Sequence, residues 1–436
     1  MMDSTISIIP LTINLLLYAL TFIAYHNKRK YWSIGTFLLL QCVVLAVLAI
    51  ASFYAPTSGW KPYKSFLHIF PFIYLYIMFM LAMYPVLKFH EEQYKLTEEP
   101  VNFIIVPVII LTLIGFLQIP EIIELFKSSI TTLVDSKQGG AHLYAQMRDN
   151  AHTSGHSATN ILAIIGNSTS EICVFLFVYL HTLKKKFTLC KIGLFSIFAC
   201  SSVRGLASGS RYIVLLAFIS LIACLVLFRP YLTKRNLSNL KTLSIVCIVI
   251  AALVVGAITI SRFGNNSKNK NATTQSVLWY TGQSMIFFNN NGLDANGIRH
   301  GDRTINLFKS FFDEDTPRNY VERRKKYSNM ALDDYVFYSF VGDFTLDYGP
   351  FWAFIIFIIA AIVLRYKTKV YGNNVEPHKL LLIFIIVNCC LQGSMTLFPY
   401  ADIGGNLKLI LFFIFYEYLK IVHYRCGKQI ENDEQD

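Results

Sequence analysis

The chain has 436 residues, of which 54% are hydrophobic and only 15% are charged. A soluble globular protein carries about 25% charged residues, so this composition excludes an ordinary water-exposed surface. The 35 Phe and 25 Tyr residues suit helices that face lipid tails and carry aromatic anchors at the headgroup level. We therefore expect an integral membrane protein.

The formal net charge of +12 does not indicate a nucleic-acid-binding protein. Such a protein needs basic residues gathered on one aqueous face with aromatic side chains between them. Here the Lys and Arg residues form short clumps between apolar runs, which is the pattern of membrane orientation. We predict no nucleic-acid partner. Most of the nine Cys residues lie inside apolar runs, so no disulfide framework is predicted either.

Eleven apolar runs are long enough, or nearly so, to cross a membrane, which needs about 20 residues of helix. In chain order they are 6–25, 33–54, 65–87, 101–119, 159–182, 189–203, 209–228, 242–261, 350–366, 379–395 and 405–424. We predict an all-α polytopic membrane protein with about eleven transmembrane helices, in a single membrane domain over residues 1–436.

The orientation follows from the positive-inside rule. With the N-terminus outside, the predicted cytoplasmic segments contain twenty Lys and Arg residues, whereas the short outside loops contain four. A missed span would reverse the sides midway and destroy this contrast. The C-terminus is therefore predicted inside.

Two predicted outside loops, 120–158 and 262–349, are too long to be simple connections. The second lies between spans eight and nine and contains apolar stretches such as 277–280 and 305–312. Their aromatic content favours a folded cap on the membrane with interfacial helices.

The short outer turn between spans six and seven reads S-S-V-R-G-L-A-S-G-S-R-Y and places Arg204, Arg211 and Tyr212 at the outer surface. One interpretation is an anion site, because the guanidinium fork binds phosphate bidentately and small residues let a phosphate approach a helix N-terminus. The alternative is that both arginines extend to the lipid headgroups.

The sequence F-V-G-D-F-T-L-D-Y-G-P at 340–350 closes the large loop. If it is helical, Asp343 and Asp347 share one face, and Gly349 with Pro350 marks the start of the next span. Either carboxylate could act as a general base on a sugar hydroxyl. The alternative is that both complement the helix dipole.

Further charged residues of the outer loops are candidates for substrate binding. Arg299 and Arg303 belong to one compact charged group, and Asp402 lies in the last outer loop among small and aromatic residues. We interpret the basic stretch 318–326 as a solvated loop face.

Two motifs have the spacing of metal ligands but lack support. His152 and His156 have no third ligand nearby. Asp313 and Asp315 match the D-x-D pattern of nucleotide-sugar glycosyltransferases, but they are predicted outside, where such substrates are absent. We predict no metal and no other cofactor.

The pattern resembles the bacterial O-antigen and capsule polymerases of the Wzy type, which join oligosaccharide repeat units. The resemblance rests on S-G-S-R-Y at 208–212, on the large late outer loop and on F-V-G-D-F-T-L-D-Y-G at 340–349. It extends to the architecture of the whole chain, although the motifs are short.

The resemblance implies a GT-C-like, metal-independent, inverting glycosyltransferase of the bacterial inner membrane. Its substrate would be an undecaprenyl-diphosphate-linked glycan, with membrane lipid, a flippase and a chain-length regulator as partners. Arg211, with Arg204, Arg299 or Arg303, would neutralise the departing diphosphate, and Asp343 or Asp347 would take the acceptor's proton. The rival interpretations are an O-antigen ligase-like transferase and a lipid-linked oligosaccharide flippase.

Overall fold

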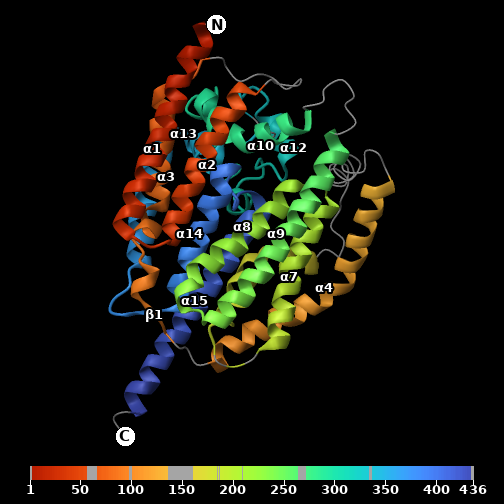
Figure 1. Cartoon of the computed structure of the whole chain (residues 1–436), viewed down its shortest axis with the longest axis vertical. Helices are drawn as coiled ribbons and strands as arrows, with labels where there is room; N and C mark the ends of the chain where they lie inside the picture. Colours follow the sequence, from red (N-terminus) through yellow and green to blue (C-terminus); the bar gives the residue numbers. More distant parts are fainter. Residues whose placement is uncertain are drawn as a thin grey trace. The chain divides into compact units, whose positions relative to one another are not determined.

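The computed structural model describes residues 2–55, 66–97, 101–135, 161–183, 185, 187–208, 210–263, 272–332 and 336–433. These residues are overwhelmingly helical, as the cartoon in Figure 1 shows. The strands among them are β1 (Lys95–Leu96) and β2 (Asn374–Val375), which pair in parallel. The predicted all-α class is confirmed.

Ten helices among the described residues are long and apolar enough to cross a membrane. They are α1 (Met2–Arg29), α2 (Ile34–Tyr54), α3 (Ile69–Leu87), α4 (Val101–Asp135), α6 (Ile161–Tyr179), α7 (Thr188–Ala207), α8 (Arg211–Phe228), α9 (Lys234–Phe263), α13 (Ser339–Thr368) and α14 (Pro377–Met395). The predicted eleventh span, 405–424, lies within α15 (Asp402–Asp433), which does not belong to these ten. The chain is a multi-pass membrane protein, and its span number and orientation stay predictions.

Helix α4 continues beyond the end that the sequence predicts. We expected the span to stop at 119 and the loop 120–158 to follow, but the helix passes through Pro120 and ends at Asp135. A proline is tolerated inside a membrane helix because neighbouring groups satisfy the carbonyl that it leaves unpaired. The apolar residues after Pro120, beginning with Ile122 and Ile123, recur at helical spacing. Residues 136–160 lie outside the described part of the chain.

The chain, predicted as one membrane domain, divides into two compact units. Unit 1 comprises 1–91, 274–369 and 385–410, and unit 2 comprises 92–273, 370–384 and 411–436. Helices α14 and α15 each begin in one unit and end in the other. The units are therefore linked by continuous helix as well as by loops.

Unit 2 is organised around the pairing of α4 with α7, to which α6 and α8 add further contacts. The two backbones approach closely at Gly115 and Gly193: a β-carbon on Gly115 would lie 2.0 Å from the carbonyl oxygen of Gly193. Small residues at such crossings let membrane helices pack by van der Waals contact.

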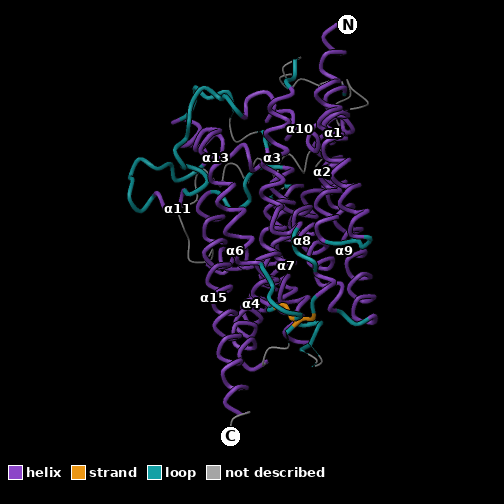
Figure 2. The backbone as a smooth tube through the Cα atoms, turned by 90° about the vertical axis from the view of Figure 1, so that its left-hand side faces the viewer, coloured by secondary structure: helices purple, strands orange, loops and turns teal. Residues whose placement is uncertain are grey.

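In unit 1, α1 packs on α2 and α3 packs on α13. Between α10 (Ala272–Phe287) and α13 the chain forms a stretch that we call the connecting segment, residues 288–332. It holds the π-helical turn η4 (Phe288–Gly292) and the short helices α11 (Asn306–Lys309) and α12 (Tyr320–Lys326). Figure 2 shows much of it as irregular backbone. The remaining short elements are η1 (Glu91–Gln93) and η3 (Arg229–Tyr231).

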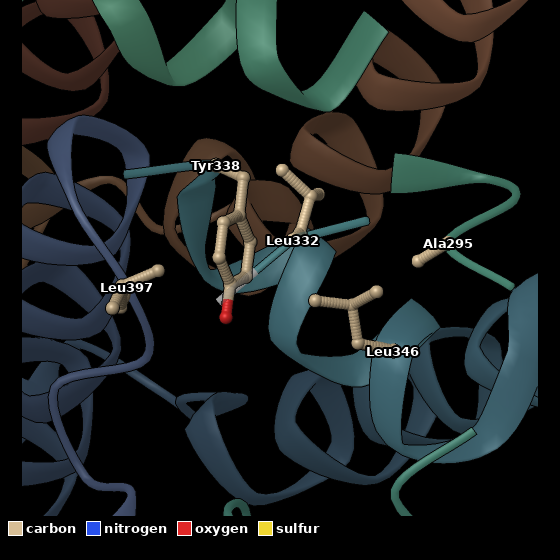
Figure 3. Close-up of a cluster of buried hydrophobic side chains, with 5 residues drawn as sticks. All are labelled: Ala295, Leu332, Tyr338, Leu346 and Leu397. Carbon is tan, nitrogen blue, oxygen red and sulfur yellow. The ribbon is translucent and has the colours of Figure 1, made fainter. Parts of the chain in front are cut away.

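A cluster of buried apolar side chains ties the connecting segment to the helices of unit 1 (Figure 3). Ala295 and Leu332 come from the connecting segment, Leu346 from α13 and Leu397 from the turn that precedes α15. Tyr338 lies in this cluster, but its hydroxyl reaches the charged groups described below. Burial of these side chains therefore fixes the backbone on which the charged groups stand.

Candidate functional site

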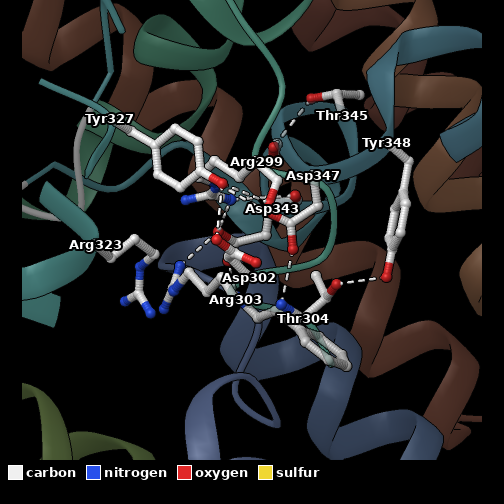
Figure 4. A network of polar contacts seen from close by, with 12 residues as sticks. Arg299, Asp302, Arg303, Thr304, Arg323, Tyr327, Asp343, Thr345, Asp347 and Tyr348 are labelled. Carbon is white, nitrogen blue, oxygen red and sulfur yellow. Dashed lines mark hydrogen bonds and ion pairs between the residues drawn. The ribbon is translucent and has the colours of Figure 1, made fainter. Parts of the chain in front are cut away.

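Charged side chains from three parts of unit 1 converge on one another (Figure 4). The connecting segment contributes arginines and Asp302, and α13 and the first residue of α15 contribute the other carboxylates. We call this set the arginine network, and its members are Arg299, Asp302, Arg303, Arg323, Asp343, Asp347 and Asp402. All five predicted site residues outside the 204–212 turn belong to this network.

Helix α13 positions the two carboxylates as the sequence predicts. Asp343 and Asp347 are four residues apart in helical backbone and are both completely buried. The helix is interrupted at Gly349, whose φ of 77° and ψ of 159° lie outside the helical region. Glycine adopts a positive φ without a steric penalty. The kink separates the carboxylate-bearing turns from the apolar helix that begins at Pro350.

Arg299 connects the two carboxylates of α13. Its Nε donates to Asp347 Oδ1 at 2.7 Å, and its Nη2 donates to Asp343 Oδ1 at 3.1 Å. Its Nη1 donates to the hydroxyl of Tyr338 at 3.2 Å. Three of its nitrogens thus have partners inside the protein. Because these groups are buried, hydrogen bonds within the protein replace those that water would otherwise make to the ion pair.

The remaining oxygens of these carboxylates are also occupied. Asp343 Oδ1 accepts a further bond from Arg303 Nη1 at 2.5 Å, and Asp343 Oδ2 accepts one from the backbone N–H of Phe398 at 2.6 Å. Asp347 Oδ2 accepts from the backbone N–H of Thr304 at 2.7 Å. Every carboxylate oxygen of α13 in the network therefore has a donor. This arrangement fits a structural anchor better than a general base.

Asp402 differs from the other two carboxylates because its side chain is 45% exposed. Its Oδ1 accepts from Arg323 Nη1 at 2.5 Å, and its Oδ2 lies 3.6 Å from Arg303 Nε. Its backbone N–H donates to the carbonyl oxygen of Arg303 at 2.9 Å, and its φ is 60°. Two buried guanidinium groups thus share one carboxylate at the solvent boundary. We call these three residues the Asp402 pair site.

Asp302 joins the two short helices of the connecting segment. This fully buried carboxylate accepts bonds from Lys309 at the end of α11, from Lys326 Nζ at 2.8 Å and from Tyr327 Oη at 2.7 Å. Burial alone would raise the pKa of Asp302, but the hydrogen bonds from Lys309, Lys326 and Tyr327 outweigh burial and lower the pKa. Asp302 therefore stays ionised and holds α12, which carries Arg323.

Arg323 is the residue that our sequence interpretation missed. We assigned 318–326 to a solvated loop face, yet the Arg323 side chain is only 2% exposed. A signal was present, because Tyr320, Arg323 and Tyr327 follow one another at helical spacing and place Arg323 between two aromatic residues on one face. Of the other basic residues of α12, Lys325 and Lys326 are exposed as expected, and Arg324 is partly buried.

In unit 2, Arg204 has a partner that the sequence did not suggest. Its Nη2 lies 2.8 Å from Glu121 Oε2, and its Nε lies 3.2 Å from Glu121 Oε1. Nη1 also donates to the carbonyl oxygen of Ala163 and to Asn167 Oδ1. Glu121 falls in the continuation of α4 that we had predicted as a loop. The charge of Arg204 is thus balanced by an ion pair within the protein. This differs from both interpretations of the sequence, the anion site and the contact with lipid headgroups.

Arg211 is the first residue of α8, and Tyr212 follows it. The side chain of Ser210 caps this helix by accepting a bond from the backbone N–H of Ile213. The predicted opening of a helix after S-G-S is therefore present. The side chains of Arg211 and Tyr212 lie outside what the structure describes.

The two metal motifs receive no support from the residues that can be described. His152 and His156 lie outside the described ranges. Asp313 lies 3.4 Å from Lys309 Nζ, and its Oδ1 accepts the backbone N–H of Asp315, so this carboxylate serves the local turn. Within the described ranges no three His, Cys, Asp or Glu residues are grouped as metal ligands.

Comparison with known proteins does not name the site. No family model matches the chain, and neither the curated proteins nor the solved structures contain a significant match. What the site can do must therefore follow from its chemistry. It offers two buried guanidinium groups and one accessible carboxylate, a combination suited to holding an anion beside a group that takes up a proton.

Proposed function

We propose that this membrane protein is a glycosyltransferase that joins lipid-diphosphate-linked oligosaccharide repeat units into a surface polysaccharide, O-antigen or capsule, at the outer face of a bacterial inner membrane. The observation that carries the proposal is the Asp402 pair site, in which Arg303 and Arg323 meet one half-exposed carboxylate. The positive-inside rule predicts that this site lies on the non-cytoplasmic side. The resemblance to the polymerase family supports the same substrate class.

The arginines suit a departing diphosphate. Planar guanidinium groups bind phosphate oxygens bidentately, and their burial strengthens the interaction with a developing negative charge. Arg323 and Arg303 are buried side by side at one face of Asp402. A diphosphate bound to both groups would compete with Asp402 for them. Binding of the donor would therefore release the carboxylate from its partners.

The released Asp402 then has a role as base. The oxygen of an acceptor sugar hydroxyl attacks the anomeric carbon of the donor, the bond from that carbon to the diphosphate oxygen breaks, and its electron pair leaves with the lipid diphosphate. The hydroxyl proton goes to Asp402. No acid is required, because the diphosphate is already a good leaving group. Attack from the face opposite the leaving group inverts the anomeric centre.

This assignment moves the base from α13 to α15. We first assigned the role to Asp343 or Asp347, but both side chains are fully buried and every oxygen has a donor. We now propose that they hold Arg299, Arg303 and the backbone of Thr304 in place. Arg211 stays a proposed phosphate ligand at the start of α8, whereas Arg204 is satisfied by Glu121.

The test uses a host strain that lacks the gene. A polymerase deletion leaves single repeat units on the acceptor, a ligase deletion leaves no glycan there, and a flippase deletion traps intermediates in the cytoplasm. Single repeat units are expected. Either of the other two results would overturn the polymerase assignment in favour of that rival.

Complementation then tests the site. Arg323→Lys is expected to restore little polymer, since a point charge cannot replace the guanidinium fork, with a rate loss of about a hundredfold. Lys325→Ala, on the exposed face of the same helix, is the matched control and should restore full chain lengths. Arg211→Ala should abolish polymer, and Arg211→Lys should rescue poorly. Full-length polymer from Arg323→Lys would remove Arg323 from the mechanism.

A further inference from the structure

Helix α11 and the turn after it present three phenylalanines to the surroundings. Phe312 is 92% exposed, Phe311 72% and Phe308 43%. We call these three residues the phenylalanine tip. Within the same short helix, Asn306 is buried and donates to the carbonyl oxygens of Asp302 and Pro317. The helix is thus anchored on its polar side and apolar on the other, and adjacent aromatic residues exposed in this way mark a binding surface.

The tip is held close to the start of an apolar membrane helix. Thr304 Oγ1 lies 2.8 Å from the hydroxyl of Tyr348, directly before the Gly349 kink of α13. Farther along the segment, the backbone N–H of Leu307 donates to Asn406 Oδ1 at 2.9 Å. Ile298 packs at the kink itself, because a β-carbon on Gly349 would lie 3.5 Å from Ile298 Cδ1. The backbone that carries the tip is therefore fixed to this end of the helix.

Apolar side chains are exposed on both the connecting segment and the start of the apolar part of α13. Ile298 and Ile305 are exposed on the segment, and Phe351 and Trp352 are exposed in the first turn after the kink. Phe351 and Trp352 begin a stretch with the length and hydropathy of a membrane span, so lipid is their expected surrounding. In Figure 2 the loop that carries α11 projects sideways beyond α13. A loop that projects sideways at this end of a span meets the same bilayer.

Charge around the tip favours uncharged lipid. Lys309 points back to Asp302 and Asp313, so its charge is neutralised within the segment. The residues that follow Phe312 are Asp313, Glu314 and Asp315. A polybasic patch would indicate anionic headgroups, whereas the residues that directly follow the tip are acidic and Lys326 is paired with Asp302. The tip would therefore bind the membrane through apolar contact with acyl chains and with the headgroup boundary.

We propose that the phenylalanine tip inserts into the outer boundary of the bilayer and holds the connecting segment down on the membrane. The occupant of this surface is lipid rather than a protein partner. The consequence for the network is geometric: Asp302 links α11 to α12, so anchoring α11 also anchors Arg323. The proposal does not depend on the glycosyltransferase assignment, because lipid contact is measured directly.

The experiment places a photoreactive side chain at single positions of the full-length protein reconstituted in phosphatidylcholine vesicles. Phe312→p-benzoylphenylalanine tests the tip. Ser328→p-benzoylphenylalanine is the exposed control within the connecting segment, and Phe351→p-benzoylphenylalanine is the lipid-facing positive control. After illumination, mass spectrometry identifies lipid adducts, and gel electrophoresis identifies cross-linked protein.

Lipid adducts at position 312 should exceed those at 328 by about fivefold or more, because a probe within the acyl region is surrounded by C–H bonds and a solvated probe is not. Adducts at 351 without adducts at 312 would overturn the proposal. Cross-linking of position 312 to a second copy, in place of lipid, would also overturn it and would assign the tip to a protein interface.

Discussion

Two regions of this protein pair their arginine side chains with carboxylates in different ways. In unit 1 three buried arginines are matched by carboxylates from α13 and α15, and the carboxylates share donors. In unit 2 a single arginine, Arg204, meets a single glutamate across α7 and α4. If one arginine of the network exchanges its carboxylate for another anion, the remaining ion pairs stay formed. In the isolated Arg204–Glu121 pair, the same exchange would leave the glutamate without its arginine. The exchange within the network is what the proposed binding of a lipid diphosphate would use.

The carboxylates of the arginine network also differ from one another in exposure. Asp343 and Asp347 are fully buried, while Asp402 is half exposed; Arg303 contacts both Asp343 and Asp402, and Arg323 contacts Asp402. The inner carboxylates thus hold the guanidinium groups, and the outer one leaves a face that a ligand can reach. In the proposed transferase this division would separate the residues that anchor the network from the residue that takes part in the reaction.

The largest expected effect comes from the inner part of the network. Asp343→Asn leaves Arg299 and Arg303 buried with one charge partner fewer, which should lower the free energy of unfolding by about 3–5 kcal/mol. Thermal unfolding of the detergent-purified protein measures this loss. Asp402→Asn is the comparison and should cost less than Asp343→Asn, because water can reach the half-exposed side chain and partly solvate its arginine partners. Equal unfolding midpoints for the two variants would contradict the division of roles.

The outer part should affect activity rather than stability. Asp402→Asn keeps the shape of the side chain but cannot take a proton, so polymer formation should fall by about a hundredfold. Quantified chain lengths from complemented cells, compared at equal protein abundance, provide the measurement. An Asp402→Glu variant should retain part of the activity. Wild-type polymer from Asp402→Asn would exclude this carboxylate as the base.

The isolated pair of unit 2 should behave as a structural contact. Arg204→Met or Glu121→Met alone should each destabilise by about 1 kcal/mol, whereas the double variant should recover much of that loss. Unfolding midpoints of the four proteins in the cycle give the coupling. If the double variant is stable yet inactive, Arg204 has a role beyond its pairing with Glu121.

The smallest effect is a pH dependence from Asp302. Its pKa is lowered in the folded state, so its contribution to stability is full above the unfolded pKa of about 4 and is lost as the pH falls through the folded value. The pKa of Lys309 is raised: burial acts to lower it, but its bond to Asp302 prevails. That contribution is lost only as the pH rises above about 10.5.

The contribution of Asp302 and Lys309 to the free energy of unfolding should therefore be constant between about pH 5 and 10. Unfolding midpoints measured across the acidic range test the prediction. Asp302→Asn should show a shallower decline below about pH 4 than the wild type. An unchanged acidic decline in this variant would show that other carboxylates cause it.

Much of the local structure was predictable from the sequence. The apolar runs identify the membrane helices, and the i, i+4 spacing places Asp343 and Asp347 on one face of α13. Gly349 followed by Pro350 marks the kink. Each of these follows from contacts within one or two helical turns, where chemical identity and spacing are enough.

Burial and partner choice were decided only by the tertiary structure. Asp347 and Arg299 are 48 residues apart, and Arg323 and Asp402 are 79 apart, so no local spacing relates them. The basic run 320–326 has the pattern of a solvated face, and only the fold shows that one of its arginines, Arg323, is buried and paired with a carboxylate. Glu121 was missed because Pro120 reads as a helix end, whereas the packed helix continues through it.

The sequence by itself determined the solvent of this protein, because few charges and long apolar runs leave a bilayer as the only compatible environment. It also indicated most of the charged residues that meet in the arginine network, although not Arg323. The tertiary structure decided which of them are consumed in holding the protein together and which one faces outward. The physical reason is that a charge acquires its role from its partners and its exposure, and both depend on segments distant in the chain.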